Sequence, residues 1–227
     1  MRILAVDTSS ERGSVCVAQS GEVLGEVRLS SSIQHSERLF GSIEFLFRYL
    51  PFQLQDIELF VSARGPGSFT GLRVGLAATE GFAAAFKKQK AGVSTLEAVA
   101  WNVGVTNSLI AATIDARRGE VYGASYRRIG NELIEQDAPV VLKPAAWLAA
   151  LPEEPVVFCG DGAIRYREMI EEHSGWDVRN IDLYLARAMA EIALLHGGGP
   201  MQPLYVRKTD AEIARERLHE SIGSPHP

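Results

Sequence analysis

The spacing of hydrophobic residues divides the chain into short buried strands and amphipathic helices. Apolar runs typical of strands lie at 2–6, 13–18, 22–29, 57–63, 91–95, 108–115, 120–128, 132–136 and 156–159. Helices are expected at 36–50, from about 71 to 86, and at 96–103, 163–173 and 183–196, and a last strand at 204–207. A strand, hairpin and helix order thus occurs twice. We therefore expect two related α/β lobes, 1–104 and 105–227, each with a mixed sheet and flanking helices.

A glycine-rich turn joins the strand at 57–63 to the second long helix. Such a turn at a helix N-terminus gathers backbone N–H groups that bind anions. The P-loop pattern fails, because Gly65 and Gly71 are six residues apart. The dinucleotide pattern also fails, because Thr70 takes the place of its third glycine. The candidate anion-site residues of the turn are Gly65, Gly67 and Ser68.

Asp7 ends the first strand and is followed by two hydroxyl residues, Thr8 and Ser9. A carboxylate in this place could hold Mg²⁺ beside a nucleotide. The alternative is a turn capped by Asp and Ser side chains, which the spacing favours. Together with the glycine turn, these residues form a candidate vestigial nucleotide or anion site.

The two long helices of the first lobe carry a candidate partner interface. Small residues on one face of the second helix would let another helix approach closely. The alternative is that this face packs on the chain's own sheet, and the pattern leaves both open. The residues assigned to the interface are Leu39, Ile43, Leu46 and Leu50 in the first helix and Gly71, Gly75, Ala78 and Phe82 in the second.

Composition and charge narrow the functional classes. Net charge is −5, so tight binding of nucleic acid by this chain alone is not expected. No apolar run is long enough for a membrane span, and we expect a cytoplasmic protein. Cys16 and Cys159 lie in apolar runs and are expected as buried free thiols. His35 has no second ligand one turn further along its helix, so no metal site is expected.

Five blocks of the sequence stand out: ILAVDTS at 3–9, HSERL at 35–39, GPGSFTGLRVG at 65–75, DARRGEVY at 115–122 and PLYVR at 203–207. Together they resemble the TsaB family, whose members are the bacterial dimerisation subunit of the tRNA threonylcarbamoyladenosine machinery. The resemblance covers nearly the whole chain, and the glycine block is its most specific part.

The resemblance implies an actin/hexokinase-like fold and a non-catalytic scaffold role. The implied partners are a TsaD-like catalytic subunit, a TsaE-like ATPase and a second copy of this chain, with tRNA bound only indirectly. The first two helices would form the interface. No cofactor is implied, except ATP or ADP at a subunit junction. Two alternatives stay open, an ATP-dependent kinase or ATPase of the same fold and a metallopeptidase-like protein.

Overall fold

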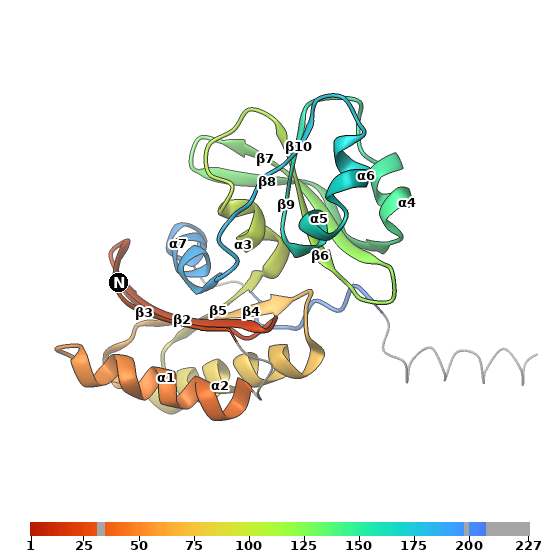
Figure 1. The fold of residues 1–227 in the computed structure, drawn as a ribbon. Helices are drawn as coiled ribbons and strands as arrows, with labels where there is room; N and C mark the ends of the chain where they lie inside the picture. Colours follow the sequence, from red (N-terminus) through yellow and green to blue (C-terminus); the bar gives the residue numbers. More distant parts are fainter. Residues whose placement is uncertain (31–34, 198–199, 208–227) are drawn as a thin grey trace, which may run out of the picture.

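Two five-stranded mixed sheets of the same design form the framework of the molecule (Figure 1). The computed structural model describes residues 1–30, 35–197 and 200–207, without the side chains of 35–37. The first sheet contains β1 (Arg2–Asp7), β2 (Arg12–Gln19), β3 (Glu22–Ser30), β4 (Leu59–Gly65) and β5 (Gln89–Ser94). The second contains β6 (Leu109–Asp115), β7 (Val121–Ile129), β8 (Glu132–Leu142), β9 (Val156–Cys159) and β10 (Trp176–Val178).

Each sheet has an antiparallel half and a parallel half. The first has the order β3-β2-β1-β4-β5, and the second has the equivalent order β8-β7-β6-β9-β10. In both, the first three strands are antiparallel and the last two join them in parallel. The prediction of two similarly built α/β lobes is therefore confirmed.

Helices cover both faces of each sheet. They are α1 (His35–Tyr49), α2 (Phe69–Phe86), α3 (Thr95–Trp101), α4 (Pro144–Ala149), α5 (Asp161–Arg165), α6 (Arg167–Glu171) and α7 (Ala186–His196), with a 3₁₀ turn at Leu54–Asp56. Figure 1 shows α1 and α2 on the outer face of the first sheet, α3 and α7 between the sheets, and α4 to α6 beyond the second. The lobe boundary near residue 104 stays a prediction, since α7 packs on the first sheet although it follows the second in sequence.

The alternation of side chains along β1 explains why this strand is apolar throughout. Ile3 and Ala5 belong to the central cluster with α3 and α7, whereas Leu4 and Val6 face α1 and α2. Because successive side chains point to opposite faces, a strand covered on both faces has no polar side. A third cluster lies between the second sheet and α4 to α6.

Some elements differ from the sequence prediction. The helix expected at 163–173 is two short helices, α5 and α6, which meet at Tyr166. The strand expected at 132–136 runs on to Leu142, and α4 and β10 were not predicted. Residues 204–207 do not form a strand.

Residues 200–207 instead form an extended segment, here called the strap, which joins the two lobes. Leu204 N donates a hydrogen bond to Arg64 O of β4 at 2.7 Å. At the other end, Arg207 Nη1 donates to Ala116 O of the second lobe at 2.8 Å, and Arg207 also pairs with Glu120. The strap therefore ties the end of β4 to the loop between β6 and β7.

Candidate functional site

The glycine turn packs directly against the loop that follows β1. Ser68 N donates to Ser9 O at 2.7 Å, and Thr8 Oγ1 donates to Gly71 O at 2.7 Å. A side-chain carbon at Gly71 would overlap with Thr8 O. Only glycine permits this approach. The backbone of the turn and of the α2 N-terminus therefore contacts the loop that follows β1.

The N-terminus of α2 is partly satisfied by its own cap. Ser68 Oγ accepts from Gly71 N at 3.3 Å, and Ser68 O accepts from Leu72 N at 2.8 Å. The bond from Gly71 N uses one N–H group that would otherwise be available to an anion, whereas the bond from Leu72 N is the first regular bond of the helix. The structure brings Ser9, Gly67 and Ser68 together, and their role as an anion site stays a prediction. Gly65 lies apart from them, paired with Ser94 of β5.

Asp7 is buried and points to the side of the sheet where α7 lies. Its Oδ1 accepts a hydrogen bond from Ser9 N at 2.9 Å. Burial raises the pKa of Asp7 from 3.8 to about 6, although hydrogen bonds from Ser9 and from the backbone of Leu185 act in the opposite direction. Since Leu185 precedes α7, Asp7 lies next to the start of that helix. This is the structural alternative that the sequence favoured.

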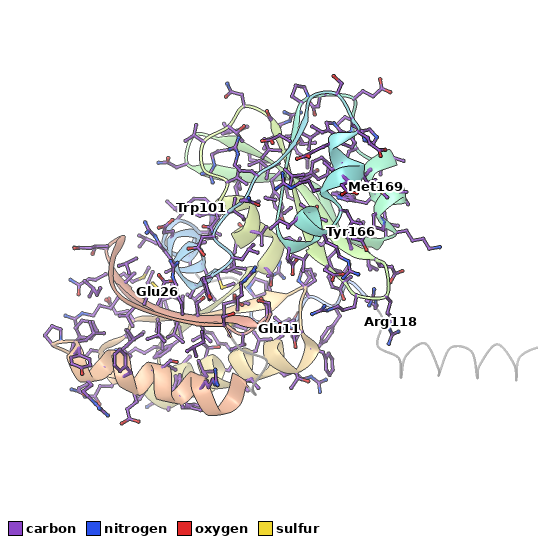
Figure 2. The ribbon with its side chains drawn as sticks, in the orientation of Figure 1. Glu11, Glu26, Trp101, Arg118, Tyr166 and Met169 are labelled. Carbon is purple, nitrogen blue, oxygen red and sulfur yellow. The ribbon has the colours of Figure 1, made fainter. Side chains whose placement is uncertain are left out.

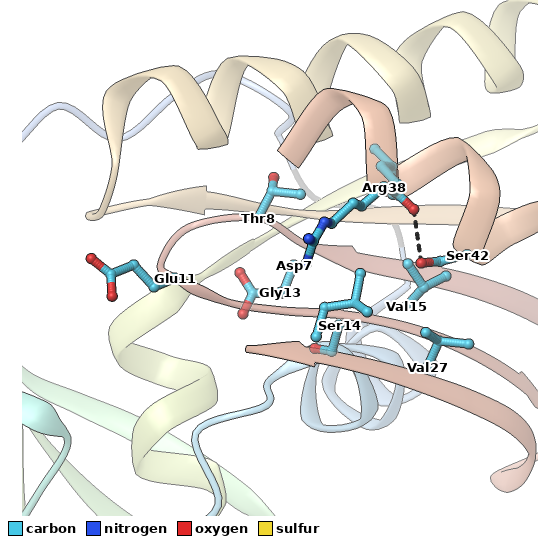
Figure 3. Close-up of a pocket in the computed structure, with 11 residues that line it drawn as sticks. Asp7, Thr8, Glu11, Gly13, Ser14, Val15, Val27, Arg38 and Ser42 are labelled. Atoms are coloured by element: carbon cyan, nitrogen blue, oxygen red, sulfur yellow. Dashed lines mark hydrogen bonds between the residues drawn. The ribbon is translucent and has the colours of Figure 1, made fainter. Parts of the chain in front are cut away.

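The side chain of Asp7 is buried on the α7 side of the sheet and does not line the cleft between the lobes, so it is not placed to hold the magnesium of a nucleotide there. Figure 3 shows the cavity beside the end of β1, with Arg38 reaching across it from α1 and Ser14 on the neighbouring strand. Ser42 Oγ donates to Arg38 O at 2.8 Å and fixes the first turns of α1. The cavity holds about 20 Å³, room for about one water molecule.

A larger polar cleft of about 670 Å³ lies between the lobes. Glu11 and Arg118, labelled in Figure 2, line it from the first and second lobes. Asp115 pairs with Arg117 at 3.7 Å and with Arg165 at 2.9 Å, and Arg117 also reaches Glu11 at 3.6 Å. These pairs hold the charged residues around the basic turn in place.

Asp161 completes the wall of this cleft at the start of α5. Its Oδ1 accepts from Asp115 N at 3.0 Å, and burial raises the pKa of its carboxyl group. Asp161 therefore links the start of α5 to the end of β6. Among the residues that the structure describes, no group of three His, Cys, Asp or Glu side chains could hold a metal ion.

The predicted partner interface is wrong for most of its residues. Leu39, Ile43 and Leu46 are buried against the first sheet within the chain's own core. Gly71 and Gly75 face the same sheet. A side-chain carbon at Gly75 would lie 2.5 Å from Thr8 Oγ1 and 2.9 Å from Ser62 Oγ. The small-residue face is therefore an internal contact.

The remaining predicted interface residues, Leu50, Ala78 and Phe82, are half-buried at the edge of that core. Each keeps enough exposed surface to contact a partner. Phe82 packs edge-on against Phe40 of α1, with 6.1 Å between ring centroids. Their place in an interface stays a prediction.

The outer surface of the same helices is open and carries exposed apolar residues beside the ion pair of Glu44 and Arg48. Phe40, Phe45 and Tyr49 of α1 are 53%, 52% and 73% exposed. On α2, Ala77, Gly81 and Ala84 are exposed at helical spacing. This set, together with Gly41 of α1, is called the helix-pair face below. The sequence analysis missed this face. The signal that could have found it is the spacing of Gly41, Phe45 and Tyr49, which lie four residues apart along α1.

Comparison with solved structures places this architecture in the actin/hexokinase-like class of α/β folds, as expected. A protein from Pseudomonas aeruginosa, described as similar to peptidase YEAZ, superposes with a TM-score of 0.79 at 26% identity, covering 91% of this chain and 99% of that one. Component A of (R)-2-hydroxyglutaryl-CoA dehydratase from Acidaminococcus fermentans shares the fold alone, with a TM-score of 0.51 at 11% identity, covering 86% of this chain and 97% of that one.

The sequence comparisons identify the family within that class. The family model of TsaD, tRNA N6-adenosine threonylcarbamoyltransferase, matches residues 22–178. The tRNA threonylcarbamoyladenosine biosynthesis protein TsaB of Bacillus subtilis is 32% identical, covering 93% of this chain and 96% of that protein. The chain belongs to the TsaB family, which takes part in the biosynthesis of threonylcarbamoyladenosine in tRNA. No helix among the described residues is long and apolar enough to cross a membrane.

Proposed function

We propose that this chain is a non-catalytic subunit that binds and supports a TsaD-like catalytic subunit, which transfers threonylcarbamoyl to N6 of adenosine 37 in tRNAs that read ANN codons. Family membership supports the pathway. The helix-pair face supports the binding role and is the observation that carries the proposal. A TsaE-like ATPase and a second copy of this chain are further proposed partners, and tRNA reaches the chain within the complex.

The glycines of the helix-pair face argue for a close helix partner. Gly41 and Gly81 lie inside helices, and a side-chain carbon at either would meet nothing within 4 Å. Glycine inside a helix costs about 0.5–1 kcal/mol relative to alanine. No contact within the described part of the chain accounts for that cost. A partner helix packed across the small residues would account for it, since small residues allow helix axes to approach closely.

The closed glycine turn supports a non-catalytic role. Ser9 O and Ser68 Oγ use N–H groups of the turn, and Asp7 is turned toward α7. The kinase or ATPase alternative needs those groups for phosphate and magnesium. It predicts ATP hydrolysis by the isolated chain, whereas our proposal predicts none. No observation on the described residues favours the metallopeptidase alternative.

Gly81→Leu tests the partner contact. Leucine has the better helix propensity by several tenths of a kcal/mol, so the melting temperature should be unchanged or higher. If a partner helix packs there, overpacking of about 1–3 kcal/mol should weaken binding of the TsaD-like subunit by roughly 5- to 150-fold. Titration calorimetry with the purified partner measures the affinity.

Ala146→Leu is the matched control, because Ala146 is an exposed helical residue of α4 in the other lobe. It should change neither the affinity nor the modification of tRNA in a mixture of the chain, its TsaD-like and TsaE-like partners, ATP and substrate. An unchanged affinity in Gly81→Leu would contradict the proposed interface.

A further inference from the structure

An aromatic groove of about 380 Å³ lies at the N-terminal end of α2, beside the interlobe cleft. It is lined by Pro66, Phe69, Leu72, Tyr122 and the strap. Gly67, Arg118, Tyr122 and Arg207 line both the groove and the cleft, so the two hollows are continuous. Neither belongs to the helix-pair face.

Two large aromatic side chains are exposed in the groove. Phe69 and Tyr205 are 41% and 46% exposed, and their ring centroids lie 5.5 Å apart with a tilt of 35°. Neither belongs to a hydrophobic core cluster of the described residues. Exposed rings that contribute little to the core form stacking platforms for planar groups.

Two arginines lie beside aromatic rings of the groove, Arg207 in its lining and Arg73 next to it. The Arg73 guanidinium lies 3.9 Å from the centroid of the Phe69 ring. Arg207 is held in place by Ala116 O and Glu120 and lies 5.7 Å from the centroid of the Tyr122 ring. Fixed guanidinium groups beside aromatic rings provide phosphate contacts and stacking partners together. The hydroxyls of Ser10, Ser30 and Ser68 add donors along the adjoining cleft.

We propose that the groove and the cleft together bind a short single-stranded RNA segment, whose bases stack on Phe69 and Tyr205 and whose phosphates contact the arginines. This inference rests on the proposed function, because a catalytic partner is what brings RNA to the chain. The net charge of −5 keeps the isolated chain a weak binder. Within the complex, the partner supplies the remaining affinity, and this groove orients one strand.

Binding of RNA to the assembled complex of this chain and its TsaD-like partner tests the inference. The probe is a fluorescent anticodon stem-loop of an ANN-decoding tRNA, and anisotropy reports its affinity. Phe69→Ala and Tyr205→Ala should each weaken binding by about 5- to 150-fold, the range for loss of one base stack. Phe69→Trp should retain affinity, since it keeps a stacking surface.

Arg73→Gln gives a second, independent readout. Loss of one phosphate contact should reduce the slope of log affinity against log salt by about 0.7, the value for single strands. Arg127→Gln is the control, because Arg127 lies on β7 in an ion pair with Glu154, outside the groove. It should leave both affinity and slope unchanged.

The affinity of each variant for the partner, measured without RNA, separates this inference from the proposed function. Weaker RNA binding with unchanged partner affinity supports the RNA site. Unchanged RNA binding in both alanine variants overturns it. Weaker partner binding in the absence of RNA would show instead that the groove takes an acidic or aromatic segment of the partner, and would also overturn it. In each of these cases the Gly81→Leu experiment still decides whether the helix-pair face binds the TsaD-like partner.

Discussion

Asp7→Asn tests the role of the buried carboxylate at the end of β1. Asparagine has nearly the same shape and keeps an oxygen that can accept from Ser9 N, the bond that measures 2.9 Å. It removes the charge that burial disfavours. Asp7 is 1% exposed, and its Oδ2 has no hydrogen-bond partner among the described residues. The ionised form is therefore the costly one.

The sign of the pH dependence follows from the raised pKa. Because the pKa rises from 3.8 to about 6, the folded chain binds this proton more tightly than the unfolded chain does. The protein should therefore lose stability as pH rises from about 4 to 6. At 1.36 kcal/mol per pKa unit, the loss at pH 8 is roughly 3 kcal/mol. The asparagine side chain does not titrate, so the variant escapes this loss.

Urea unfolding of both proteins at pH 4 and pH 8 measures the effect. From pH 4 to pH 8, the original protein should lose roughly 2–3 kcal/mol of its free energy of unfolding relative to the variant. Equal m-values at both pH values would show that the same unfolding reaction is compared. A difference that does not vary with pH would refute the reasoning, since it would mean that Asp7 is ionised equally in both states.

Two further predictions concern the interior. Gly75→Leu should lower the melting temperature, because the new side chain would enter the space of Thr8 and Ser62, and overpacking typically costs about 1–3 kcal/mol; an unchanged melting curve would contradict the assignment of this face to the core. Burial raises the pKa of Cys16 to about 12 and also raises that of Cys159. Both thiols should resist iodoacetamide at pH 8 in the folded chain and react in urea, and labelling of the folded chain would count against their burial.

The sequence predicted most strands and the repeated lobe design because buried strands leave a strong hydrophobic signal. The limits of β8 were missed for a local reason. Asp137 and Pro139 are poor strand residues, so the predicted strand ended at Gln136. β8 is the edge of its sheet, where a proline is tolerated because one side of the strand has no partner.

The assignment of one face of α2 to the partner interface was wrong for a different reason. α2 has two faces lined with small residues, one with Gly71 and Gly75 and one with Ala77 and Gly81. Helical periodicity shows that both faces exist but not which one meets the sheet. The contact of Thr8 with Gly71 decides it, and that contact joins residues 63 positions apart in sequence. Only the tertiary structure shows such a pairing.

The position of α7 has a consequence for synthesis of the chain on the ribosome. The inner face of the first sheet, with Ile3, Ala5 and Cys16, is complete in sequence at Ser94, but α7 covers it only after residue 196 has been made. At about 5–20 residues per second, that delay lasts roughly 5–20 seconds. During this interval the nascent first lobe exposes an apolar surface that binds chaperones or misassembles. A slow translation rate over 100–196 should therefore lower the yield of native protein.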